Sequence, residues 1–132
     1  MEHRSILIVT GNPDVHAAFR AILERHGAEV ITAATASDGL FEARRLRPSL
    51  VVTDYPTFLP DGITLARALR SDPLTDTIPV LALVSRAMPL EWMKAREDGC
   101  TTVLASPASL LRAVSVAERL MHGYSVDLQP ME

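Results

Sequence analysis

One carboxylate in the sequence has a position suited to chemistry. Asp54 ends a segment that begins with the apolar run Leu50–Val52, which predicts a strand buried on both faces of a parallel sheet. The carboxyl ends of such strands form the crevice in which α/β proteins bind ligands. We therefore expect Asp54 to lie in a crevice, where its chemistry depends on its neighbours.

The same crevice should collect the ends of the other central strands. These strands are expected to end at Thr10, Val84 and Leu104. They bring one hydroxyl and two aliphatic groups to the carboxylate of Asp54. The bland alternative is that this carboxylate only accepts hydrogen bonds from N–H groups of the loop before Pro56.

The remaining acids, the histidines and the cysteine form no ligand pattern. Asp61 before Gly62 is typical of a turn, and Asp14 is typical of an acid in the first turn of a helix, although a displaced metal ligand is its alternative. No metal-ligand spacing relates His3, His16, His26, His122 and Cys100. We expect no metal site, and we expect Cys100 to be semi-buried rather than reactive.

The composition predicts one globular domain. The chain has 132 residues, of which 48% are hydrophobic and 22% charged, and its net charge is −3. This charge argues against nucleic acid as a partner. The apolar run near the N-terminus is too short for a membrane span, and the single cysteine fits a reducing compartment. We expect a cytoplasmic protein without a membrane anchor.

Short apolar runs alternate with longer amphipathic segments along the chain. Strands are predicted at residues 6–9, 29–33, 50–52, 78–84 and 101–104. Helices are predicted to begin near Asn12, near Thr35 or Ser37, and near Ile63, Pro89 and Pro107. This alternation predicts a doubly wound α/β fold with a five-stranded parallel sheet. Residues 1–121 form the expected domain, and residues 122–132 a C-terminal tail.

Four ordered blocks of sequence carry a resemblance to a known family. They are ILIVTGNPDV, RPSLVVTDYPTFLPDG, DTIPVLALVSRAMP and EDGCTTVLASPASL. Over about residues 5–121 the chain resembles the receiver domain of two-component response regulators. The resemblance implies a flavodoxin-like (βα)5 sandwich with strand order 2-1-3-4-5. It also implies a phosphorelay in which a histidine kinase phosphorylates Asp54, assisted by Mg²⁺ on an acidic pair.

The sequence departs from the family where the family carries its functional groups. Thr10 and Gly11 replace the acidic pair, Val84 the switch serine or threonine, Val103 the switch aromatic residue, and Ser106 the lysine. Mg²⁺ therefore loses the carboxylates that hold it. We interpret the chain as a degenerate receiver, or pseudo-receiver, that is not an enzyme and acts by phosphorylation-independent protein–protein interaction. The resemblance also makes Pro107 a candidate cis-proline.

An apolar cluster at the start of the predicted helix 89–99 is a candidate interaction face. It comprises Met88, Leu90, Trp92 and Met93. These four side chains cannot all point inward, and an exposed apolar patch often marks a partner surface. The expected partner is a histidine kinase, another signalling protein or a second copy in a homodimer. In the alternative, Trp92 lies half-covered on its own helix.

Two other functions remain open. Asp54 could be a slow or metal-independent phosphoacceptor. A flavodoxin-like nucleotide or flavin binder is suggested by the run VTGN after the first strand. The second function is disfavoured because Pro13 removes an N–H donor and Asp14 repels a phosphate.

Overall fold

The computed structural model describes residues 4–25, 27–84, 89–105, 115–116 and 119. Its strands are β1 (Ser5–Val9), β2 (Glu29–Ala33), β3 (Leu50–Asp54), β4 (Val80–Val84) and β5 (Thr102–Ala105). Its helices are α1 (Pro13–Arg25), α2 (Ala36–Leu46), α3 (Leu65–Arg70) and α4 (Pro89–Glu97). The helix predicted to begin near Pro107 lies largely outside the described residues. Within the described residues, no helix is long and apolar enough to cross a membrane.

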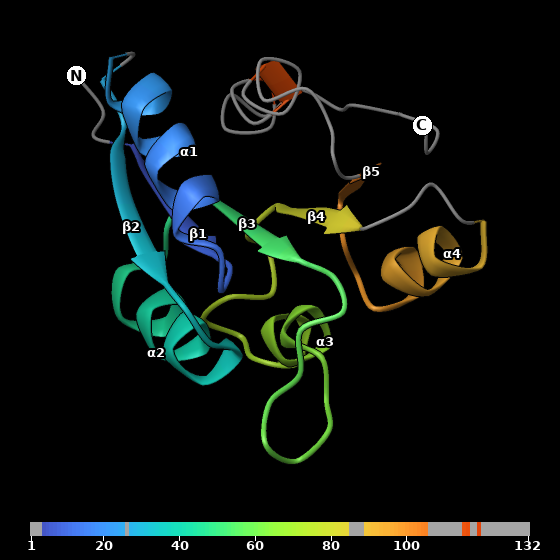
Figure 1. The fold of residues 1–132 in the computed structure, drawn as a ribbon. Helices are drawn as coiled ribbons and strands as arrows, with labels where there is room; N and C mark the ends of the chain where they lie inside the picture. The colour runs from blue at the N-terminus through green and yellow to red at the C-terminus, as the bar shows by residue number, and fades with distance from the viewer. Residues whose placement is uncertain (1–3, 26, 85–88, 106–114, 117–118, 120–132) are drawn as a thin grey trace.

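The strands form one parallel sheet in the order β2-β1-β3-β4-β5, so the predicted fold and strand order are confirmed (Figure 1). β1 and β3 are neighbours, with Val9 paired to Thr53. β3 pairs on its other side with β4, where Asp54 is in register with Leu83. This register places the end of β3 between the ends of β1 and β4.

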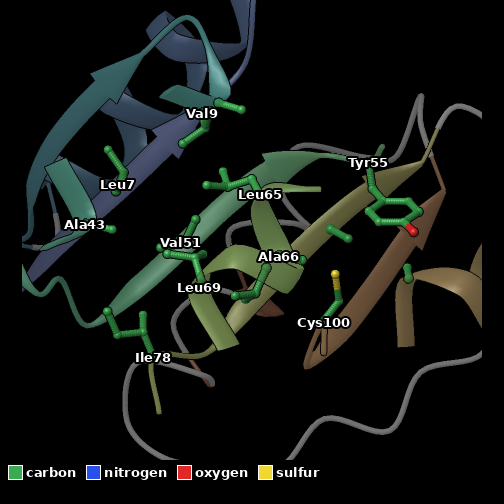
Figure 2. Packing of buried hydrophobic residues seen from close by; sticks show 14 of the residues in the cluster. Leu7, Val9, Ala43, Val51, Tyr55, Leu65, Ala66, Leu69, Ile78 and Cys100 are labelled. Carbon is green, nitrogen blue, oxygen red and sulfur yellow. The ribbon is translucent and has the colours of Figure 1, made fainter. Parts of the chain in front are cut away.

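Both faces of the sheet are apolar, as a sheet wrapped by helices requires. On one face, α1 buries Phe19 and Leu23 against alternate strand residues. On the other face, α2, α3 and α4 pack on the second set (Figure 1). Figure 2 shows this second cluster, in which Leu65 and Leu69 of α3 lie beside Val51 of β3. The alternation of side chains along each strand divides the core into these two layers.

N-cap threonines set where two of the helices begin. Thr35 is the N-cap of α2, one of the two predicted caps, and its hydroxyl accepts from the N–H of Asp38 at 3.1 Å. α3 begins at Leu65 and not at Ile63 as predicted, because Thr64 is its N-cap. β4 likewise begins at Val80, two residues later than predicted.

Candidate functional site

Asp54 lies at the end of β3, half-buried, and its carboxylate meets the first residue after β1. The hydroxyl of Thr10 donates a hydrogen bond of 2.6 Å to Oδ2 of Asp54. Thr10 is only 3% exposed, and its hydroxyl oxygen accepts the N–H of Asn12 at 3.1 Å. A hydroxyl has one proton to donate, so that proton is committed to the carboxylate. The convergence of strand ends therefore produces a charge-assisted hydrogen bond.

The loop after β3 binds the main chain of Asp54 rather than its carboxylate. The hydroxyls of Thr57 and Thr53 donate to the carbonyl oxygen of Asp54 at 2.7 and 3.0 Å. The N–H of Tyr55 donates to the carbonyl of Leu83 at 2.9 Å. Among the described residues, the donor to the carboxylate is therefore the Thr10 hydroxyl, whereas the alternative interpretation of Asp54 has loop N–H groups as donors.

The described side chains near Asp54 do not offer Mg²⁺ its preferred oxygen ligands. Thr10 brings a neutral hydroxyl that is already used, and Gly11 is exposed and brings no side chain. Oδ1 of Asn12 accepts the N–H of Asp14 at 2.9 Å, which caps α1. No group of three or more histidine, cysteine, aspartate or glutamate residues in the described part of the chain could hold a metal ion. The acidic pair that the family resemblance implies for Mg²⁺ therefore has no substitute cluster among these residues.

The two positions that the family resemblance assigns to the switch are buried among apolar groups. Val84 and Val103 are both 0% exposed and belong to the cluster that contains Tyr55 and Cys100. Their aliphatic side chains have no atom that could hydrogen-bond a phosphoryl oxygen. Ser106 and the candidate cis-proline Pro107 lie outside the described residues. The cis peptide bond in the described residues is Tyr55–Pro56.

Asp98, at the end of α4, joins α4 to the segment after β3. Oδ2 of Asp98 accepts the Tyr55 hydroxyl at 2.7 Å and the Thr64 hydroxyl at 2.9 Å. Oδ1 accepts Nε of Arg67 at 3.1 Å. We call these four residues the Asp98 network. This network could not be predicted from the sequence, because no spacing rule relates residues 55, 64, 67 and 98.

The protonation of Asp98 follows from its donors. Burial acts to raise the pKa of Asp98, but hydrogen bonds from Tyr55, Thr64 and Arg67 hold this pKa below its usual value. Burial and the hydrogen bond to Asp98 raise the pKa of Tyr55. The network is therefore an ionised carboxylate with two neutral hydroxyls and one guanidinium.

Arg70 makes a second link between α3 and the turn after α4. Its guanidinium donates to the carbonyls of Gly99 at 2.9 Å and Ile78 at 2.7 Å. Gly99 has a φ of +99°, and a Cβ there would collide with the Arg70 side chain. Burial lowers the pKa of Arg70. Together with the Asp98 network, this contact holds the end of α4 against α3.

The candidate interaction face on α4 is only partly exposed. Leu90 and Met93 are 63% and 51% exposed, whereas Met88 lies outside the described residues. Trp92 packs partly buried against the core, with the Arg96 guanidinium 5.6 Å from its ring centre. Trp92 is thus half-covered on its own helix, which is the alternative left open by the sequence. Cys100 is buried, and burial raises its pKa to about 12.

Comparisons with known proteins agree with this architecture. The family described as response regulator receiver domain matches residues 6–116. The polar-differentiation response regulator DivK of Brucella anthropi is 29% identical over 111 residues, which is 84% of this chain and 90% of DivK. Protein PilH of Pseudomonas aeruginosa is 28% identical over 113 residues, 83% of this chain and 93% of PilH. The crystal structure of a response regulator from Desulfuromonas acetoxidans superposes with a TM-score of 0.81 at 25% identity, covering 90% of this chain and 97% of that one.

Proposed function

This chain belongs to the family of response regulator receiver domains, and we propose that it recognises a protein partner without phosphorylation of Asp54. The observation that carries the proposal is the 2.6 Å hydrogen bond from Thr10 to Asp54. It occurs where the family has an acidic residue for Mg²⁺. In this proposal the domain works in two-component signalling in the cytoplasm. It acts as a signalling module and not as an enzyme.

Phosphoryl transfer to a carboxylate is hard without a cation. The attacking carboxylate and the phosphoryl group are both anionic, so a divalent ion must neutralise and orient them. Thr10 supplies a dipole and no charge, and Gly11 supplies neither. A hydrogen bond to a charged group contributes about 1.5–3 kcal/mol, and attack through Oδ2 would have to break it. Thr10 therefore stabilises unmodified Asp54.

The second support is the apolar character of the switch positions. A phosphorylation signal requires two arrangements with different affinity for the modified site. Val84 and Val103 are fully buried and have no polar atom that could follow a phosphoryl group. The Asp98 network and Arg70 meanwhile link the end of α4 to α3 and to the loop after β3. A partner would then recognise a surface that is always present.

The direct test is a phosphorylation assay on the purified domain. The protein is incubated with Mg²⁺ and acetyl phosphate, and its intact mass is measured. We expect no addition of a phosphoryl group, and Asp54→Asn should bind the partner as the unmodified chain does. An addition that is lost in Asp54→Asn would overturn the proposal.

A slow phosphoacceptor is the second candidate function. The half-buried Asp54 carboxylate favours it, because the site is not sealed from solvent. In that case the mass increase would appear over long incubation and would not require Mg²⁺. The partner would also distinguish Asp54→Asn from the unmodified chain.

A further inference from the structure

A groove of about 410 Å³ lies between α4 and the loop that follows β3. Its volume falls in the range of about 300–1,000 Å³ that is usual for binding pockets. Its lining includes Tyr55 and Phe58 on the loop side, and Glu91, Lys94, Glu97 and Asp98 on the α4 side. We call this surface the α4 groove.

Two large apolar side chains are exposed at the α4 groove, with Phe58 in its lining and Leu90 beside it. Phe58 is 58% exposed although its backbone is fixed by a bridge to Thr64. Leu90 is 63% exposed, and helical periodicity places it on the same side of α4 as Lys94 and Glu97. Large apolar side chains on an ordered surface are typical of a protein contact.

The charged part of the groove has an excess of negative charge. Asp98 is already compensated by Arg67 and two hydroxyls. Glu91 and Glu97 face a single Lys94 across this surface. Oε2 of Glu91 accepts no hydrogen bond from the described residues, so none of their donors compensates that oxygen. The groove therefore complements a cation next to an apolar group.

We propose that the α4 groove binds a segment of a partner protein that carries a lysine or arginine next to a large apolar residue. The cationic group pairs with Glu91 and Glu97, and the apolar residue packs on Phe58 and Leu90. A second copy of this chain would meet the groove with the same negative charges if the two faces were related by a twofold axis. The partner is therefore a different protein. This inference rests on the proposed function, because it names the partner of phosphorylation-independent recognition.

Two blocked hexapeptides test the proposal on the full chain, without Mg²⁺ or phosphodonor. One alternates leucine with arginine, and the other alternates leucine with glutamate. We expect saturable amide NMR shifts at Phe58, Leu90, Lys94 and Glu97 with the arginine peptide only. Binding should weaken as salt rises, because exposed charges are screened. Equal binding of both peptides, or no saturable shift with either, would overturn the proposal.

Matched variants locate the binding surface. Glu97→Lys should weaken binding of the arginine peptide by about fivefold or more, as expected for reversing one exposed charge. Glu24→Lys makes the same change of charge on α1, across the sheet, and should leave binding within about twofold. Phe58→Ala should also weaken binding. Unchanged affinity in Glu97→Lys would contradict the assignment.

The failures of the two proposals can be told apart. If neither peptide binds and phosphodonors add no phosphoryl group, the proposal that the α4 groove is the binding site is overturned. Phosphorylation-independent recognition then stands. If Asp54 accepts a phosphoryl group, that proposed function fails whatever the peptides do. If dilution of the free protein shifts the same groove amides, the occupant is a second copy, and the groove proposal is overturned.

Discussion

The hydroxyl of Thr10 has one proton, and it is donated to Oδ2 of Asp54 at 2.6 Å. The same oxygen accepts the N–H of Asn12, so the side chain links the start of the β1–α1 loop to the end of β3. A hydroxyl can do this because it is both donor and acceptor. At this position a carboxylate could accept the N–H but could not donate to an ionised Asp54. Thr10 thus stabilises the end of β3 through a side-chain contact that involves no metal.

Thr10→Val removes this hydroxyl and keeps the shape of the side chain. We expect the free energy of unfolding at neutral pH to fall by about 1.5–3 kcal/mol, because a hydrogen bond to a charged group is lost in a half-buried place. Urea unfolding measures the change. The control is Thr10→Ser, which keeps the hydroxyl and should lose about half as much or less. Equal stability of Thr10→Val and the unmodified chain would refute the role of this hydrogen bond.

The position of Asp54 could be predicted from sequence, but its partner could not. A buried run ending in an acid predicts a strand end, and parallel strand ends converge. Which group donates to the carboxylate depends on side-chain rotamers and on the loop after β3. That loop directs the Thr57 hydroxyl to the main chain of Asp54 instead.

Between elements, α4 is held to α3 by the Asp98 network and by Arg70. Asp98 is 14% exposed and accepts three donors from two other segments. No sequence pattern could identify these contacts, because Tyr55 and Asp98 are 43 residues apart and meet only after the sheet forms. Gly99 was predicted only as a helix end. Gly99 has a second role, because its lack of a Cβ leaves room for the Arg70 side chain.

Asp98→Asn tests the network through its pH dependence. The pKa of Asp98 is lower in the folded than in the unfolded state, so its ionised form stabilises the fold. We expect the unmodified chain to be more stable than Asp98→Asn by about 1–3 kcal/mol above the unfolded pKa of the carboxyl group. This difference should shrink as pH falls below 3.8 and through the folded pKa.

The control for this experiment is Glu97→Gln, which neutralises the exposed carboxylate of the last residue of α4, next to Asp98. Its stability should follow that of the unmodified chain at each pH, since the Glu97 carboxylate accepts no hydrogen bond from the described residues. Urea midpoints at several pH values give the comparison. If the difference between Asp98→Asn and the unmodified chain grew on acidification, the pKa of Asp98 would be raised by folding, not lowered.

Gly99→Ala tests the contact of the α4–β5 turn with Arg70. Gly99 and Gly27 both have positive φ, at +99° and +86°, but only at Gly99 would a Cβ meet another side chain. Gly27→Ala should cost about 1–2 kcal/mol from backbone strain alone. Gly99→Ala should cost about 1–3 kcal/mol more because of the collision. Equal losses in thermal unfolding would show that Arg70 moves away freely.

At the scale of the molecule, the fold is that of the receiver family, and we propose that the polar groups of its crevice are replaced. One apolar layer on each face of the sheet holds the strands together, and the described residues of neither layer form a metal site. The fold could be predicted because apolar runs and caps are local signals. The α4 groove could not, because it combines a loop and a helix that are distant in sequence.

Restoring the acidic pair tests whether the fold still has room for a metal. The variant is Thr10→Asp with Gly11→Asp, and a Cβ at Gly11 would meet nothing within 4 Å. We expect this double variant to be less stable than the unmodified chain without metal, since three carboxylates repel each other. Mg²⁺ should raise its melting temperature and leave that of the unmodified chain unchanged. The neutral variant Thr10→Asn with Gly11→Asn is the control, and a Mg²⁺ response there would contradict the charge argument.

The most direct test of the central claim is a titration of the unmodified chain with Mg²⁺ and beryllofluoride, a phosphoryl mimic. Amide NMR shifts and Trp92 fluorescence are recorded together. Phosphorylation-independent action predicts no saturable change at Asp54, Thr10 or Val84, and no change in fluorescence. A saturable shift centred on Asp54 that spreads to Val84 and α4 would contradict it, and would show that the site binds a phosphoryl group and switches without the acidic pair.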